Sequence, residues 1–151
     1  MPNYIGSIVS VAPAVPASFT KAGYEALTWT VVNGLIVAPI PAFETATIDV
    51  PDLTTGITKR EKGASVGRET EMSFRDTGVA DTGQTNIRTY AAPGYGTEVS
   101  VRVVRPGTGN THTYMSGIMY SLMDNEGTTE SYRGFTVTFS QNYDAVITTA
   151  P

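Results

Sequence analysis

The sequence predicts a mainly β protein: an antiparallel β-sandwich or barrel with one flanking α-helix and a long assembly loop. Segments with an apolar residue at every second position recur along the chain, which is the period of half-buried strands. Charged residues make up only 16% of the chain, whereas glycine, threonine, serine and valine are abundant, a composition typical of turn-rich β proteins. A single segment combines helix-capping residues with a later helix stop. A chain of 151 residues is most simply one domain, residues 1–151.

The first 17 residues precede the first strongly β-branched run. Because Pro13 and Pro16 favour an extended backbone, we interpret residues 1–17 as an N-terminal arm that lies against a neighbouring molecule. Residues 28–39 follow as strand-forming sequence, interrupted at Asn33 and Gly34 by either a tight hairpin turn or a bulge.

A second extended piece, residues 42–50, ends before Pro51. The following residues, 52–67, contain glycines and both signs of charge but no hydrophobic period, so they are predicted to form a long loop. A loop of this length in a compact domain is usually functional or disordered.

A strand and a capped helix come next. Thr70, Met72 and Phe74 are expected to face the core, and the alternate positions 69, 71, 73 and 75 to face away from it. Asp81 can accept from the first-turn amides, and Gln84 can reach back to the cap in a capping box, so a helix is predicted over residues 82–92.

Three more strands complete the prediction. Residues 98–105 place Val99, Val101 and Val103 on one face, and residues 132–140 place Phe135, Val137 and Phe139 inward. Between them, residues 111–123 place two sets of side chains on opposite faces. Tyr114, Ile118, Tyr120 and Leu122 form one set, and Met115, Met119 and Met123 form the other. The turns are expected at 105–110 and 124–127.

Composition excludes several classes of function. Without cysteine there are no disulfides, thiolate nucleophiles or cysteine-ligated zinc sites. The net charge of −4 does not provide the basic surface that duplex binding requires, although DNA can pass an acidic surface without adhering. No run is long enough to span a membrane and no basic signal-peptide region is present, so a soluble, cytoplasmically made product with no membrane partner is expected.

Residues 59–88 resemble the major tail tube proteins of long-tailed (siphovirus-like) bacteriophages. The matching residues are Lys62 and Gly63, then Asp81, Gly83, Gln84 and Arg88. Residues 18–34 are similar to that family's short N-terminal helix and first core strand. The resemblance implies a structural virion protein that stacks as hexameric rings into a conduit for DNA ejection. It also implies contacts with tape measure, tail tip and terminator proteins, residence in the virion tail, and no catalysis or cofactor.

Two sets of charged residues are candidates for this assembly. Lys59, Arg60, Glu61 and Lys62 are expected in a loop that reaches the adjacent ring, with plain solvent exposure as the alternative. The carboxylates Glu44, Asp49, Glu69 and Glu71 are expected on a sheet face, which is either solvated or an acidic lumen lining.

Catalytic interpretations fit the sequence poorly. The tripeptide DTG begins at Asp76 and Asp81, but aspartic proteases bring together two carboxylates from equivalent loops, so turn and cap roles are favoured. His112 is the only histidine, and Ser116 and Ser121 lack a nucleophile-elbow pattern. We predict no catalytic or metal-binding residues.

Two alternatives to a tail tube stay open. One is another ring-forming virion or secretion-tube component. The other is a carbohydrate-binding sandwich, for which Tyr90, Tyr95, Tyr132 and Tyr143 would need to form an exposed cluster.

Overall fold

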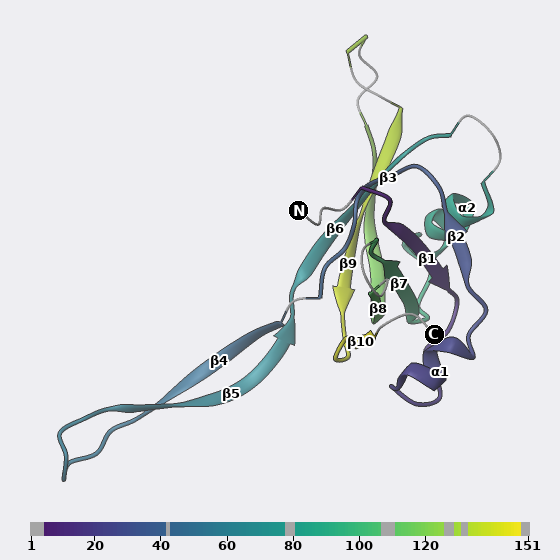
Figure 1. Cartoon of the computed structure of the whole chain (residues 1–151). Coiled ribbons are helices and arrows are strands. Elements are labelled where there is room, and N and C mark those ends of the chain that lie inside the picture. The colour runs from purple at the N-terminus through teal and green to yellow at the C-terminus, as the bar shows by residue number, and fades with distance from the viewer. Residues whose placement is uncertain are drawn as a thin grey trace.

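The computed structural model describes residues 5–41, 43–77, 81–106, 111–125, 129–130 and 133–148. Within them lie ten strands and two helices (Figure 1). The elements are β1 (Ile8–Ala12), α1 (Lys21–Glu25), β2 (Thr30–Val32), β3 (Leu35–Val37), β4 (Phe43–Val50), β5 (Lys59–Gly67), β6 (Glu69–Arg75), α2 (Thr82–Tyr90), β7 (Val99–Val104), β8 (His112–Asp124), β9 (Gly134–Gln141) and β10 (Val146–Thr148). The predicted fold class, mainly β with antiparallel sheets and one main helix, is confirmed.

The main sheet is curled. Its strand order is β2-β1-β7-β8-β9-β6-β3, with β10 also pairing with β8, so β2 and β3 stand at opposite ends. Only Asn33 and Gly34 separate these two strands in sequence, and three residue steps of extended chain span about 10 Å. The two ends must therefore approach each other. Gly34 permits this crossing because its φ is +79° and a Cβ there would meet the Arg75 carbonyl oxygen.

The inner face of this sheet forms the core. The alternate apolar residues of β7, β9 and β6 are buried, including the predicted Val99, Phe135 and Phe74. Helix α2 covers this face with Ile87 and Tyr90, and the residue that caps its C-terminus, Ala91, is buried there as well. The prediction of which side chains face the core in residues 69–75, 98–105 and 132–140 is confirmed, because the apolar ones are buried. Thr70 is half-buried.

The outer face is covered over only part of its width. Tyr24 of α1 stacks on Tyr114, with ring centroids 5.0 Å apart, and its hydroxyl lies 3.0 Å from the Ser116 hydroxyl. Ser100 Oγ donates to the Ala14 carbonyl, and Trp29 Nε1 donates to the Tyr24 carbonyl. These contacts cover β7 and the first half of β8.

The prediction of an extended N-terminal arm over residues 1–17 is wrong for part of that range. Residues Ile8–Ala12 form β1, which pairs with both β2 and β7, and Val9, Val11 and Ala12 are buried. This segment forms a strand because apolar residues alternate along it, and because both prolines lie after its last residue. Residues 1–4 of the proposed arm lie outside the described part.

The expected faces of residues 111–123 hold only as far as Tyr120. Ser121 has φ +55°, and the β8–β9 register shifts between Tyr120 and Met123. This bulge reverses the alternation, so Leu122 packs against the core while Met123 is 68% exposed. The turns predicted at 105–110 and 124–127 fall largely outside the described residues.

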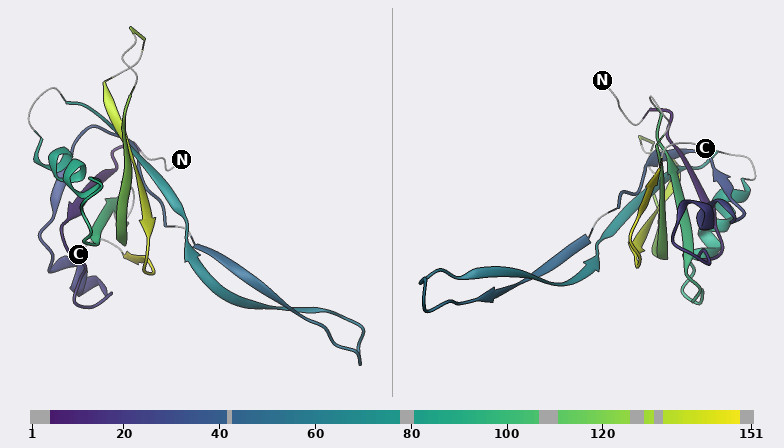
Figure 2. Two further views of the ribbon diagram at one scale, coloured as in Figure 1. Left: turned by 180° about the vertical axis from the view of Figure 1, so that it is seen from behind. Right: turned by 60° about the horizontal axis from the view of Figure 1, so that its bottom comes forward.

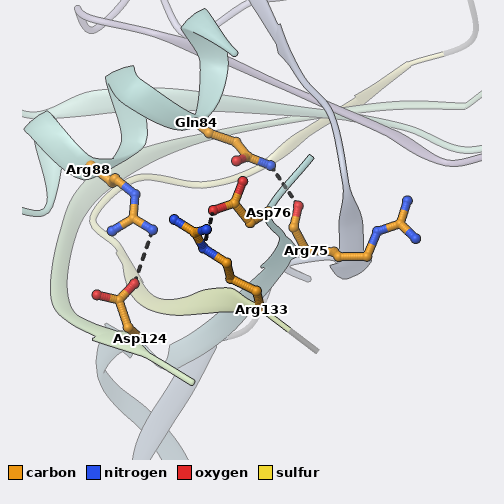
Figure 3. A network of polar contacts seen from close by, with 6 residues as sticks. All are labelled: Arg75, Asp76, Gln84, Arg88, Asp124 and Arg133. Carbon is orange, nitrogen blue, oxygen red and sulfur yellow. Dashed lines mark hydrogen bonds and ion pairs between the residues drawn. The ribbon is translucent and has the colours of Figure 1, made fainter. Parts of the chain in front are cut away.

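Helix α2 begins as predicted but its glutamine acts differently. Asp81 accepts from the Gln84 amide at 3.2 Å. The Gln84 side chain does not return to the cap: its Nε2 donates to the carbonyl oxygens of Asn33 (2.8 Å) and Arg75 (2.9 Å, Figure 3). Gln84 thus ties the helix to the place where the curled sheet closes. The helix ends at Tyr90 rather than at residue 92.

Neither helix in the described residues is long and apolar enough to cross a membrane.

Candidate assembly surfaces

Strands β4 and β5 form a two-stranded hairpin that extends away from the rest of the molecule (Figure 1, Figure 2). β3 leads into β4, and β5 leads through Arg68 into β6, while β3 itself pairs with β6. The hairpin therefore continues the β3–β6 strand pair outward, beyond the edge of the main sheet. Every residue of β4 is exposed.

The predicted loop at 52–67 is wrong for its second half, because Lys59–Gly67 is strand β5. This strand has no hydrophobic period since neither of its faces meets a core. Only the hairpin tip is a turn, where the Gly56 amide donates to the Asp52 carbonyl at 2.9 Å and Gly56 has φ +69°.

The four charged residues of the predicted inter-ring loop lie on β5. The register places Arg60 opposite Asp49 and Glu61 opposite Ile48. Arg60 Nε lies 3.5 Å from Asp49 Oδ1, but both side chains are more than two-thirds exposed. Such a pair contributes little to stability, so the charges are available to a neighbouring surface.

The four candidate carboxylates do not share one face. Glu44 and Asp49 lie on the hairpin, an odd number of residues apart along one strand, and so point to opposite faces of it. Glu69 and Glu71 lie on β6 in the main sheet, where both are exposed. The four carboxylates therefore lie on two separate sheets, Glu44 and Asp49 on the hairpin and Glu69 and Glu71 on the main sheet.

Glu69 and Glu71 belong to the uncovered part of the outer face. They lie opposite Ser140 and Thr138 of β9, and Tyr120 of β8 lies opposite Thr138 on its other side. Burial, followed by the hydrogen bond and negative charge of Glu69, raises the pKa of Tyr120 to about 12. Tyr120 consequently stays protonated and donates to Glu69. This face thus carries the two carboxylates together with the exposed side chains of Ile118 and Met123.

The hairpin also carries many exposed apolar side chains. Six are at least 38% exposed: Phe43, Ile48, Val50, Leu53, Ile57 and Val66. An isolated two-stranded hairpin is marginally stable in water, and clustered exposed apolar residues mark interaction surfaces. The hairpin has the properties of an interface.

Strand β8 has an open edge. β7 pairs with it only as far as Gly117, and β9 pairs with it from Gly117 to Asp124. In the part of the chain that the structure describes, Ile118–Asp124 therefore pairs with β9 on one side and with no strand on the other. A row of unpaired backbone groups is a template for another strand.

No protein-family model matches the chain, and no curated protein matches it. Solved structures do. One is from the PVC sheath–tube complex of an extracellular contractile injection system in its extended state, with TM-score 0.65 and 11% identity over 99% of this chain and 92% of that one. The chain shares the fold of a contractile injection system component.

Two further structures have the same fold. One is from the PVC sheath/tube terminator, with TM-score 0.61 and 12% identity over 98% of this chain and 97% of that one. The other is from the tube-terminating cap of the anti-feeding prophage, with the same TM-score and identity over 99% and 91%. The fold is thus one that also occurs in injection-system tube and cap assemblies, and it does not point to a siphovirus tube in particular. These are tube and cap structures rather than enzymes.

The injection-system fold here contains a polar cluster that the sequence did not reveal (Figure 3). Arg88 Nη2 lies 3.0 Å from Asp124 Oδ1, and Arg133 Nε lies 3.0 Å from Asp76 Oδ2. The Arg88 guanidinium also lies 4.4 Å from the centre of the Phe135 ring. These groups join the ends of β6, β8 and β9 to α2, and their pairing with one another indicates a structural role.

The residues that could have suggested catalysis, the two DTG aspartates and His112, make structural contacts. Asp76 binds Arg133 and Asp81 caps α2, as turn and cap roles require. His112 Nδ1 lies 3.3 Å from the Tyr114 hydroxyl, and burial, then the charge of Arg102, lowers the pKa of His112. Among the described residues, no three His, Cys, Asp or Glu side chains are grouped to hold a metal.

The tyrosines do not form the exposed cluster that a carbohydrate site needs. Tyr90 is buried and packs on Tyr95, with ring centroids 5.3 Å apart. Tyr143 stacks on Phe19 and donates to Glu98. Tyr132 lies outside the described residues. The carbohydrate-binding alternative therefore has no support among the other three.

Proposed function

We propose that this chain is the tube subunit of a phage tail or tail-like injection machine, assembling as hexameric rings that stack into a conduit. The observation that carries this proposal is that β8 and β4, the outer strands of one run of neighbouring strands, each have an edge that is open to another strand. The injection-system fold supports it.

The run consists of β8, β9, β6 and the β3–β4 strand line, and each neighbouring pair in it is antiparallel. Because the run is even-numbered, its two outer strands point in opposite directions. The open stretch Ile118–Asp124 of one copy can therefore pair antiparallel with Phe43–Val50 of the next. The two stretches are similar in length, and such pairing covers both edges.

Repeating this contact closes a barrel around a central channel. Six copies would contribute roughly 24 strands, which at a spacing of about 4.8 Å and a tilt near 40° give a backbone circle about 48 Å across. That leaves room for a DNA duplex after side chains are added. In this arrangement the subunit needs no cofactor and no membrane.

Partners and location follow from this role. The subunit would contact its own copies, then the tape measure, tail tip and terminator proteins of the tail, and it would be made in the host bacterial cytoplasm before entering the virion. In a virion, viral DNA would pass through the lumen without specific binding. A secretion or injection tube with a different cargo is the second candidate, favoured by the contractile systems to which the similar structures belong.

Electron microscopy of the purified full-length protein tests the proposal. We expect long hollow tubes whose end views show sixfold rings. Protein that sediments as a monomer at high concentration, with terminator and tip partners supplied, would contradict the proposal. Isolated rings without tubes would instead favour another ring-forming component.

The lumen is proposed to be acidic, with Glu69 and Glu71 lining it. Both are exposed on the uncovered outer face, and that face must meet either the lumen or outside solvent. Glu69→Lys combined with Glu71→Lys would change repulsion of phosphate into attraction of about 1 kcal/mol at each close contact in water, repeated in every ring. We expect normal tubes and slower DNA ejection.

The measurement is the ejection rate of particles that carry the double substitution, with Glu69→Gln plus Glu71→Gln as the matched neutral control. Particles with normal tubes and a normal ejection rate would place these carboxylates outside the channel.

A further inference from the structure

Asn33 and Gly34 form the only Asn-Gly pair in the chain, and they link β2 to β3 where the curled sheet closes. Asparagine is a thermolabile residue, and it is least durable before glycine, because a glycine has no Cβ that shields its backbone nitrogen. The closure requires this glycine, since Gly34 has φ +79° and a Cβ there would meet the Arg75 carbonyl oxygen. The fold therefore keeps a reactive pair at this point.

Two polar groups of Asn33 hold α2 in place. The side-chain Nδ2 donates to Asp81 Oδ2 at 2.6 Å, and the backbone carbonyl accepts from Gln84 Nε2 at 2.8 Å. Asp81 also caps α2, because its other carboxylate oxygen accepts from the Gln84 amide. The helix cap and the closing point of the sheet thus share one asparagine. Asn33 itself is exposed, so water reaches it.

We propose that Asn33 is a site of spontaneous deamidation, and that the reaction releases α2 from the closing point of the sheet. The inference does not depend on the proposed tube function. The Gly34 backbone nitrogen attacks Asn33 Cγ. A new C–N bond forms, the Cγ–Nδ2 bond breaks, and ammonia leaves with the proton of the Gly34 amide.

Water completes the reaction. It opens the cyclic imide at either of the two carbonyl carbons and leaves an aspartate or an isoaspartate at position 33. Overall, one water is consumed and one ammonia is released, and nothing is oxidised or reduced.

Each product breaks contacts that the structure shows. An aspartate lacks the Nδ2 donor and sets a second carboxylate beside Asp81, so two negative charges repel where a donor had met an acceptor. An isoaspartate routes the main chain through the former side chain. This lengthens the link between β2 and β3 and displaces the carbonyl oxygen that accepts from Gln84. In both products, the attachment of α2 to the sheet is weakened.

Peptide mass spectrometry of the full-length protein, stored in warm and mildly alkaline buffer, tests the reaction. Asn142 is the matched reference within the same chain. It is exposed, and its Nδ2 also lies near a carboxylate oxygen, Glu98 Oε2 at 3.5 Å, but Tyr143 follows it. We expect the amide-to-carboxylate mass change to accumulate about tenfold faster at Asn33, because the tyrosine Cβ hinders attack by its nitrogen. Equal rates at the two positions would overturn the inference.

Two variants test the structural consequence. Asn33→Asp reproduces one product, and Asn33→Ala removes the same hydrogen bond without adding charge. In urea unfolding at neutral pH, we expect the folding equilibrium constant of Asn33→Asp to be about tenfold lower than that of Asn33→Ala, because only the first variant sets two carboxylates against each other.

Lowering the pH separates repulsion from the loss of a hydrogen bond. At about pH 3.5, below the usual aspartate pKa of about 3.9, protonation of one carboxyl removes the repulsion, so the difference between the variants should disappear. An Asn33→Asp chain that folds only at the lower pH would also support the inference. Equal stability of the two variants at both pH values would overturn the proposed release of α2.

Discussion

Shortening the β4–β5 hairpin is expected to abolish tube formation and leave a folded monomer. The variant removes residues 46–64 and joins Thr45 to Ser65 through Asn-Gly. These two residues are cross-strand partners whose hydroxyl oxygens lie 2.8 Å apart, and Asn-Gly favours a two-residue hairpin turn. The removed residues contribute nothing to the core cluster, so we expect the free energy of unfolding to change by less than about 1 kcal/mol.

Tube formation by microscopy and unfolding in urea are the two measurements. A charge-only variant with Lys59→Ala, Arg60→Ala and Lys62→Ala keeps the backbone and apolar residues of the hairpin. It should weaken ring-to-ring contact, with shorter tubes, and leave stability unchanged. If the shortened chain forms normal tubes, the hairpin is not needed for assembly. If the shortened chain fails to fold, the hairpin is needed for the stability of the rest of the domain.

Phe135→Ala is expected to cost about 3–5 kcal/mol of folding stability, a large part of the 5–15 kcal/mol typical of a domain. Phe135 is fully buried and belongs to the core cluster. Its ring centroid lies 5.4 Å from that of Phe74, and the Arg88 guanidinium rests on its face. The substitution leaves a cavity and also removes the surface that positions Arg88 beside Asp124.

Urea unfolding of the purified monomer measures this cost. Ile48→Ala, on the exposed hairpin, is the matched control and should change stability by less than about 0.5 kcal/mol. A loss below about 1 kcal/mol for Phe135→Ala would mean that the core rearranges around this position.

Strand β9 illustrates what local sequence can predict. Phe135, Val137 and Phe139 alternate with polar residues, and one buried face is enough to fix a strand and its orientation. The cap at Asp81 was predictable for a similar reason, since capping depends on residues within one turn. Gln84 was not: its partners, Asn33 and Arg75, are 51 and 9 residues away.

The hairpin illustrates the opposite case. Lys59–Gly67 pairs only with another exposed strand, so no buried face imposes a period on its sequence. The bulge at Ser121 is similar, because one inserted residue reverses every later side chain without changing the apolar composition.

The sequence by itself determined the β class, the inward faces of β6, β7 and β9, the helix cap and the absence of thiol chemistry, because each depends on residue type or on neighbours within a few positions. Only the tertiary structure decided that residues 8–12 join the sheet, that Glu44 and Asp49 are separated from Glu69 and Glu71, and that an open strand edge and an exposed apolar hairpin are present. These features arise from pairings between distant segments, and the free energy of such pairings is shared among many residues rather than carried by a local motif.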